Sequence, residues 1–420
     1  MSLPDFAAPS LARGQSLGER HDSTRYTAIE HSPIIAGQTL SWEHQGTRTS
    51  ATWWSANARR APKNVVVVDD RLTADAAMRN AARGTAMLWL GDFHNAKQML
   101  SAIDRRLSKA ASGKSSRKPQ SDAEKFYAIR QGRAQRSRMM SLILVPLNCD
   151  TADGEAALEL PRAPRVGPAV AFGYPQQVAS TTPSAVVSLQ ELTGVLSAYQ
   201  WYINGVDVPA LGQKIHPGYG TFLPTRHEYV DLVAKAPLNC AELAFDIGTG
   251  TGVLAAILVS RGVKSVIGTD IHQRAVDCAN DNFARLAIED SARAELTSMF
   301  PAGRAPLVIC NPPWLPGSAP TTLDAAVYDP GSKMLLQFLR GLPEHLTQDG
   351  EGWLIISDLA ELLGLRSRQL LLDAIDDAGL EVVDRIDTQP THGRATDDSD
   401  ILHAARSREV TSLWRLRTKA

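Results

Sequence analysis

The chain has 420 residues, of which 44% are apolar, and its formal net charge is −1. This length suggests two or three domains with apolar cores. The sequence contains no run of about 18 apolar residues that could span a membrane and no apolar signal segment at its start, so we expect a cytoplasmic protein. Its four cysteines are widely spaced, so we expect neither a disulfide framework nor a metal site.

The first 150 residues predict a small α/β domain behind a loose arm. Residues 1–60 mix Ser, Thr and Arg with weak periodicity, and we interpret them as the arm. From 61 to 150, strand patterns alternate with helix patterns, which indicates a small parallel sheet. Thr73 is placed to cap the first of these helices, and Gly84 to end it. The predicted strands are 64–70, 85–92 and 141–147, and the predicted helices are 73–84, 95–111 and 122–140.

A basic stretch lies inside this domain. Residues 105–138 hold eleven Lys or Arg and only two acids. The second half of the stretch predicts a helix that carries Arg130, Arg133 and Arg136. These arginines could line a solvated helix face, or they could contact the phosphates of a nucleic acid. Only two aromatic residues are interleaved with them, so the pattern leaves both interpretations open.

The remaining chain predicts a linker, residues 151–185, and a larger α/β domain, residues 186–420. A helix and a short hairpin around Asn204-Gly205 open this domain. Strands and helices then alternate, which is typical of a doubly wound, Rossmann-like sheet of seven strands. No helix separates the last two strands, so we expect an antiparallel last strand. The predicted strands are 241–248, 264–270, 294–297, 305–311, 352–358, 379–388 and 409–417, and the predicted helices are 252–261, 272–286, 330–347 and 366–378.

A glycine loop, "FDIGTGTGVLAA", joins the first of these strands to its helix. Gly248, Gly250 and Gly252 lack a Cβ, so a ligand can approach the backbone closely. The helix N-terminus behind them favours negative charge. Because Val253 follows Gly252 directly, the spacing differs from the G-x-G-x-x-G of dinucleotide-binding loops.

A second motif ends the fourth strand, in the run "VICNPPW". Two prolines cannot continue a central strand, because neither can donate a ladder hydrogen bond. Asn311 and Trp314 are therefore expected at the carboxyl edge of the sheet, where open α/β sheets bind their ligands.

Together these motifs resemble known enzymes. The glycine loop, with Asp246 two residues before it, resembles motif I of class I S-adenosylmethionine (SAM) methyltransferases. The "NPPW" run resembles motif IV of the amino-methyltransferases, which include the release-factor glutamine methyltransferases and the "methyltransferase small" rRNA guanine-N2 enzymes. The resemblance spans roughly residues 215–360. It implies SAM as cofactor and methyl transfer to the nitrogen of a planar, conjugated NH2 group.

The resemblance also implies roles for single residues. The Asn311 side-chain carbonyl and the Pro312 backbone carbonyl would accept the N–H bonds of the acceptor, Pro313 would keep the loop rigid, and Trp314 would offer a face for stacking. Asp270 would accept the ribose hydroxyls of SAM. Ser298 or Met299 stands where related enzymes carry an adenine-binding Asp. The cofactor-binding residues implied are Asp246, Gly248, Thr249, Gly250, Gly252, Asp270, Ile271, Ser298, Met299, Asn311, Phe222, Thr225 and Arg226.

The acceptor is less well defined than the reaction. A nucleobase amine in RNA or DNA and a protein glutamine amide both offer a planar NH2 group. The additional domain and the basic stretch favour a macromolecule over a metabolite. Two alternatives stay open: a small-molecule N-methyltransferase of specialised metabolism, and a non-catalytic SAM- or RNA-binding factor. The missing third-strand acid favours the latter, whereas the intact "NPPW" opposes it.

Overall fold

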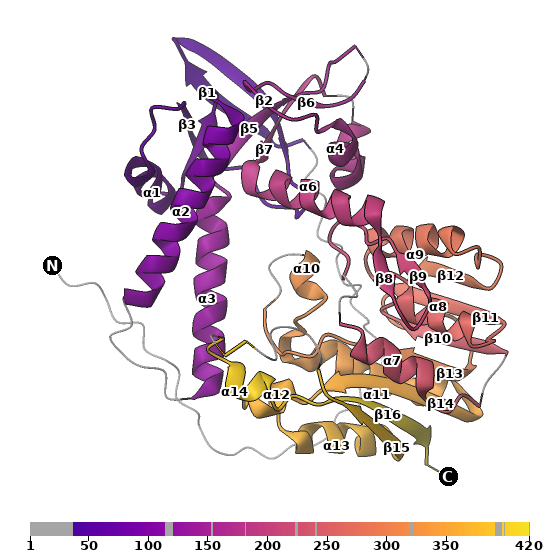
Figure 1. Cartoon of the computed structure of the whole chain (residues 1–420). Helices are drawn as coiled ribbons and strands as arrows, with labels where there is room; N and C mark the ends of the chain where they lie inside the picture. The colour runs from indigo at the N-terminus through magenta and orange to yellow at the C-terminus, as the bar shows by residue number, and fades with distance from the viewer. Residues whose placement is uncertain are drawn as a thin grey trace, which may run out of the picture. The chain divides into compact units, whose positions relative to one another are not determined.

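The structure is a computed structural model. It describes residues 37–113, 121–152, 154–180, 182–222, 226–239, 242–318, 322–390, 397–398 and 400–419. The described chain contains two seven-stranded sheets and one two-stranded sheet, with helices packed against them (Figure 1).

The first sheet is mixed, and its strand order is β1-β2-β7-β5-β4-β3, with β6 paired to β5. Strands β3, β4 and β5 are parallel, whereas β7 is antiparallel to β5. The strands are β1 (Thr39–His44), β2 (Thr47–Trp54), β3 (Asn64–Val68), β4 (Thr85–Trp89), β5 (Ile143–Asn148), β6 (Ala157–Leu158) and β7 (Ser184–Ser188).

Four strands of this sheet lie outside the predicted range of 61–150. β1 and β2 come from the segment that we expected to be a loose arm, β6 lies in the predicted linker, and β7 begins at the end of that linker. Most side chains of β1 and the first half of β2 are exposed. They therefore lack the apolar alternation that marks a half-buried strand. The parallel pairing of β2 with β7 brings together segments more than 130 residues apart, which no local pattern signals.

Helices cover the first sheet, and their ends follow the expected capping chemistry. The Thr73 hydroxyl accepts a hydrogen bond from the Ala76 backbone N–H at 3.3 Å, and Gly84 has a φ of +73°. Both predictions for this helix are confirmed. The helices are α1 (Ala74–Ala82), α2 (Phe93–Gly113), α3 (Asp122–Met140), α4 (Gly167–Gly173), α5 (Pro175–Val178) and α6 (Leu189–Asn204).

The predicted hairpin is displaced along the chain. Gly205, with a φ of +70°, ends α6 rather than forming a hairpin turn. The hairpin follows, between β8 (Val206–Val208) and β9 (Gln213–Ile215). Asn-Gly signals both a tight hairpin turn and a helix stop. Here the apolar face of a 16-residue helix, which buries Leu192 and Val195, decides for the stop.

The second sheet has the predicted doubly wound order, β12-β11-β10-β13-β14-β16-β15. Its first five strands are parallel, and β16 is antiparallel to both β14 and β15. The predicted antiparallel last strand is thereby confirmed. The strands are β10 (Leu243–Ile247), β11 (Ser265–Asp270), β12 (Ala292–Leu296), β13 (Ala305–Cys310), β14 (Leu346–Ser357), β15 (Leu380–Thr388) and β16 (Thr411–Thr418).

Both faces of the second sheet are covered. Along β13, Leu307 and Ile309 pack with α7, α8 and α9, whereas Val308 and Cys310 pack with α11 and α13. A strand buried on both faces reads as a continuous apolar run, which is why β13 was visible in the sequence. The helices are α7 (Glu228–Lys235), α8 (Val253–Ser260), α9 (Gln273–Arg285), α10 (Thr322–Ala325), the 3-10 turn η1 (Pro330–Ser332), α11 (Lys333–His345), α12 (Leu359–Leu362), α13 (Arg368–Asp377) and α14 (His403–Arg406).

Candidate active site

The register of three strands brings the predicted motifs together. Ile247 of β10 pairs with Thr269 of β11 on one side and with Cys310 of β13 on the other. The next residues along these strands are Gly248, Asp270 and Asn311. Because the three strands are parallel, these residues lie next to one another at the carboxyl edge of the sheet, where such folds bind ligands.

The glycine loop adopts a backbone that other residues would strain. Gly248, Gly250 and Gly252 have φ angles of +71°, +56° and +79°, in the left-handed region that favours glycine. A Cβ on Gly252 would lie 2.6 Å from the Phe283 ring, and one on Gly248 would lie 2.6 Å from the Met334 methyl group. The loop therefore needs glycine for its conformation and for its packing.

Asp246 organises this loop from below. Its Oδ2 accepts hydrogen bonds from the Thr249 hydroxyl at 2.7 Å and from the Ala255 backbone N–H at 3.2 Å. The side chain is 1% exposed, and burial raises the pKa of Asp246 to about 6. Thr249 is itself buried and donates inward. Both residues therefore shape the glycine loop through contacts within it.

Asp270 lies at the end of β11 and faces the loop. Its Oδ2 accepts a hydrogen bond from the Gly250 N–H at 3.2 Å, and its Oδ1 accepts one from the His272 N–H at 2.9 Å. Burial raises its pKa. Half-buried Ile271 follows it directly. Because both carboxylate oxygens keep a further lone pair, Asp270 can still accept hydrogen bonds from a ligand.

The segment after β12 lies beside Asp270. The Thr297 N–H donates to the Asp270 backbone carbonyl at 3.0 Å, and the Met299 backbone carbonyl accepts a hydrogen bond from the Thr269 hydroxyl. Ser298 between them is exposed. The structure thus brings the predicted third-strand residues to the same edge as Asp270.

The "NPPW" run contains a hydrogen bond between its own first and last residues. The Trp314 indole N–H donates to the Asn311 side-chain oxygen at 2.9 Å. Pro312 is buried, whereas Pro313 and Trp314 are half-buried. The indole fixes which amide atom of Asn311 is the oxygen and where it lies, and one lone pair of that oxygen stays available.

Arg226 supports Trp314. Its guanidinium carbon lies 4.7 Å from the centroid of the Trp314 ring. Its Nε and Nη2 pair with Glu228 at 2.7 Å and with Glu409 at 3.0 Å. Glu409 is fully buried and also accepts a hydrogen bond from the Ser357 hydroxyl at 2.7 Å. The guanidinium of Arg226, a residue predicted to bind cofactor, thus contacts Trp314 and two glutamates in this structure.

Phe222 and Thr225 were also predicted to contact the cofactor. Phe222 is half-buried and packs against Tyr229, with ring centroids 6.4 Å apart. It belongs to the apolar cluster of α7, α8 and α9. Thr225 lies outside the described residues.

Sequence reasoning missed the role of Asn282. Its Nδ2 donates to the Thr251 carbonyl at 3.0 Å and to the His216 carbonyl at 3.1 Å, and its Oδ1 accepts from the His216 N–H at 2.7 Å. Asn282 is fully buried. It therefore joins α9 to the glycine loop and to the segment before α7. The run "ANDNF" could have signalled it, since a buried asparagine needs several partners.

Asp329 was also missed. Its carboxylate accepts hydrogen bonds from the Met334 and Leu335 N–H groups at 3.1 and 3.2 Å, which caps the start of α11. Ser332 just before that helix has a φ of +54°. Backbone in this region is costly for residues other than glycine and tends to occur at functional sites. The turn places Met334 against Gly248.

The described residues offer neither a metal site nor a membrane-spanning helix. No group of three or more His, Cys, Asp or Glu side chains in this part of the chain has the arrangement of a metal site. No helix that the structure describes is long and apolar enough to cross a bilayer.

The part of the chain that contains most of the second sheet is similar to known proteins. The family profile of the methyltransferase small domain matches residues 231–362. A protein of Methanocaldococcus jannaschii, provisionally named a protein N5-glutamine methyltransferase, is 30% identical over 162 residues, which are 37% of this chain and 80% of that protein. The chain belongs to the class I SAM-dependent methyltransferase superfamily.

Two further relatives of this methyltransferase differ in their targets. The tRNA1(Val) (adenine(37)-N6)-methyltransferase of Shewanella sediminis is 30% identical over 108 residues, 24% of this chain and 44% of that protein. The release factor glutamine methyltransferase of Mycobacterium tuberculosis is 34% identical over 128 residues, 28% of this chain and 41% of that protein. The chain thus spans less than half the length of these two relatives, and the first sheet lies outside the matched profile.

Proposed function

We propose that this protein is a SAM-dependent N-methyltransferase that methylates a planar, conjugated NH2 group. The observation that carries the proposal is the meeting of the glycine loop, Asp270 and Asn311 at one edge of the second sheet. The relatives named for a tRNA adenine and for a release-factor glutamine act on residues whose target nitrogen belongs to such a group.

The residues at this edge fit SAM. Asp246 and Asp270 form no ion pair with any described Lys, Arg or His, and burial raises the pKa of both. At this edge the Asp270 carboxylate, beside His272, keeps lone pairs that can accept hydrogen bonds from a ligand. When bound, SAM supplies an electrophilic methyl group on a positively charged sulfonium. We propose that Asp270 holds its ribose and that the glycine loop N–H groups hold its carboxylate. Further contacts would come from Ile271, Ser298 and Met299.

On the acceptor side, Asn311 would act on the NH2 group. Its side-chain oxygen and the Pro312 carbonyl would each accept one N–H bond from the acceptor. These bonds draw the nitrogen lone pair out of conjugation and aim it at the methyl group, while Trp314 stacks on the planar group. Transfer would join the methyl group to this nitrogen as the methyl–sulfur bond breaks, and the acceptor nitrogen would then lose a proton to water.

We propose that the two sheets divide the work. The second sheet would carry out the transfer, and the part built on the first sheet would recognise a macromolecular acceptor. Because β7 pairs with β5 and the start of α6 packs in the first core, we place the boundary near Gly205 rather than at residue 185. A reducing cytoplasm fits the free thiols of Cys149, Cys278 and Cys310.

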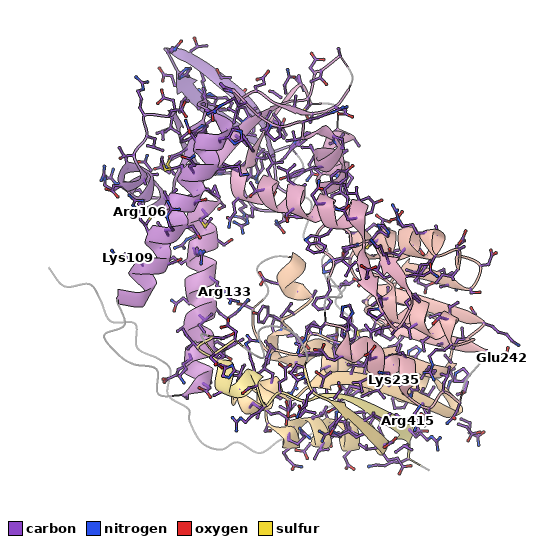
Figure 2. The ribbon with its side chains drawn as sticks, viewed as in Figure 1. Arg106, Lys109, Arg133, Lys235, Glu242 and Arg415 are labelled. Carbon is purple, nitrogen blue, oxygen red and sulfur yellow. The ribbon has the colours of Figure 1, made fainter. Side chains whose placement is uncertain are left out.

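The ion pairs on α3 reduce the three predicted phosphate contacts to one candidate. Arg136 pairs with Asp104, and Arg130 pairs with Asp324. Arg133 is exposed and, within the described chain, has no ion-pair partner; it is labelled on α3 in Figure 2, with Lys109 on the neighbouring α2. We therefore propose Arg133 as the phosphate contact. Arg133→Ala should flatten the salt dependence of nucleic-acid binding by about one unit of log–log slope. Binding to RNA and DNA that is insensitive to salt in the wild type would remove this proposal.

One experiment tests the function. The protein is incubated with methyl-labelled SAM and, separately, with RNA, DNA, protein and metabolite fractions, alongside the variant Asn311→Ala. We expect label on nitrogen in a macromolecular fraction with the wild type and much less with the variant. SAM binding without transfer to any fraction would favour the non-catalytic factor, and label in the metabolite fraction alone would favour a small-molecule enzyme.

A further inference from the structure

Helix α3 contributes to two separate apolar clusters. It has 19 residues, so it is about 28 Å long at 1.5 Å per residue. Near its end, Met139 packs in the core of the first sheet. Near its start, Phe126 is 4% exposed and packs with Leu315, Leu359 and Leu402. Leu315 directly follows Trp314, so the helix reaches the chain beside the "NPPW" run.

One turn after Phe126, Arg130 makes three contacts with this same stretch. Its Nη1 pairs with the Asp324 carboxylate at 3.1 Å, and its Nη2 donates to the Ser318 carbonyl. Its guanidinium carbon lies 3.4 Å from the centroid of the Tyr328 ring. The Arg130 side chain is only 14% exposed. We call residues 315–318 and 324–329 the acceptor segment.

The acceptor segment is joined to the proposed site at both ends. The Asp329 N–H donates to the Leu315 carbonyl at 2.9 Å, which ties the two halves of the segment together. Leu315 continues from Trp314, and Asp329 caps the helix whose Met334 packs against Gly248. A displacement of the segment would therefore move Trp314 and the neighbourhood of the glycine loop.

From this geometry we infer that Arg130 is a positioning residue that fixes the acceptor segment, so that α3 is part of the acceptor site. The inference rests on the proposed function for its consequence, methyl transfer, but not for the contact itself. A guanidinium can pair with a carboxylate, donate to a carbonyl and stack on a ring at once, which an ammonium cannot do. Arg130 is thereby committed to the segment and is not a phosphate contact.

Hydrogen–deuterium exchange tests the contact without any acceptor. Arg130→Ala should speed exchange of the amides of Leu315, Tyr328 and Asp329 by ~10-fold or more, the scale for losing a hydrogen bond to a charged group. Arg130→Lys should restore part of the protection. Arg138→Ala, an exposed arginine on the same helix, should change none of these amides. Unchanged exchange in Arg130→Ala, or an equal effect of Arg138→Ala, would overturn the inference.

A double variant tests whether Arg130 and Asp324 protect the segment through their shared contact rather than through separate effects on folding. If Arg130 and Asp324 act on the segment together, the double variant Arg130→Ala/Asp324→Ala should show no more exchange than either single variant. Additive effects would contradict a shared role.

The consequence is measured by calorimetry and by single-turnover transfer to whichever fraction the labelling experiment identifies as the acceptor. Arg130→Ala should keep the wild-type affinity for SAM and lower the transfer rate ~10-fold or more, whereas Arg138→Ala should transfer at the wild-type rate. If Arg130→Ala lowers SAM affinity as much as it lowers the transfer rate, Arg130 stabilises the whole domain rather than positioning the acceptor segment. If the wild type binds no SAM, the proposed function fails, while the exchange data still decide the contact.

Discussion

The two large sheets both place acids at the ends of parallel strands, but they treat the charge differently. In the first sheet, Asp69 pairs with Arg71 and Asp92 pairs with Arg162, each at 2.6 Å. These arginines lower the pKa of both acids. In the second sheet, burial raises the pKa of Asp246 and Asp270, and no described cation pairs with either. Acids at strand ends are thus paired with arginines in the first sheet and buried without a described partner of this kind in the second.

The loops differ in the same sense. In the first sheet the Asp70 carboxylate accepts hydrogen bonds from the Asp92 N–H and the Asn95 amide. It lies so close to Gly91 that a Cβ there would be 2.6 Å from Asp70 Oδ1. A side chain of the protein therefore fills that strand end. In the second sheet the corresponding strand end carries the glycine loop, whose Gly250 N–H donates to Asp270.

The largest expected effect comes from Asn311. Asn311→Ala removes the oxygen that orients the NH2 group, so single-turnover transfer should fall by ~10²-fold or more, as for other pre-organised transition-state partners. Asn311→Asp should do less harm, because a carboxylate still accepts the N–H bond. Asn95→Ala, at the corresponding edge of the first sheet, should transfer at the wild-type rate. Wild-type transfer by Asn311→Ala, or a product methylated on oxygen or carbon, would refute the mechanism.

Asp246 in the second sheet and Asp92 in the first should contribute to the free energy of unfolding with opposite pH dependence. Burial raises the pKa of Asp246 to about 6, above the value of about 3.9 in an unfolded chain. Between those values only the folded state holds the proton, so the folded state loses stability as pH rises from about 4 to 6. The free energy of unfolding of Asp246→Asn, minus that of the wild type, should therefore grow by roughly 3 kcal/mol between about pH 4 and pH 7.

The matched variant is Asp92→Asn. The lowered pKa of Asp92 contributes stability that is present above about pH 3.9 and is lost as pH falls through the pKa of the folded state. Denaturant unfolding of the three proteins across this range measures both differences. If the difference in free energy of unfolding between Asp246→Asn and the wild type does not change with pH, folding does not raise the pKa of Asp246.

SAM affinity provides the next contrast. Asp270→Ala should weaken SAM binding by ~1.5–3 kcal/mol, the range for hydrogen bonds to charged groups. Asp92→Ala should leave SAM binding unchanged, because its carboxylate serves its own sheet. Isothermal calorimetry measures both. Equal affinity of wild type and Asp270→Ala would remove Asp270 from the cofactor site.

Trp314 gives the smallest expected effect. Trp314→Phe keeps a stacking face but loses the N–H that donates to Asn311. The activation free energy of transfer should therefore rise by ~0.5–1.5 kcal/mol, the net contribution of one hydrogen bond. Trp314→Ala should lose ~1–3 kcal/mol of stacking with the acceptor if the target is a base. Single-turnover rates, compared with SAM affinity, separate the two losses. A Phe variant as fast as the wild type would show that the indole N–H does not position Asn311.

The sequence by itself determined the second sheet and the order of its motifs. Strands such as β13 are buried on both faces and read as apolar runs, and the prolines after Asn311 mark the strand end. Once the strands are parallel, their carboxyl ends must share one edge, which is why the strand pattern together with the family resemblance could place Gly248, Asp270 and Asn311 near one another.

Only the tertiary structure decided the contacts that support those motifs. The pairing of β2 with β7, the contacts of Arg226 with Glu409 and Trp314, and the reach of Arg130 to Asp324 join segments that are far apart in the chain. A guanidinium on a helix has the same local pattern whether it meets solvent, a phosphate or a buried carboxylate. Which of these it meets depends on long-range packing, and that information is absent from any short stretch of sequence.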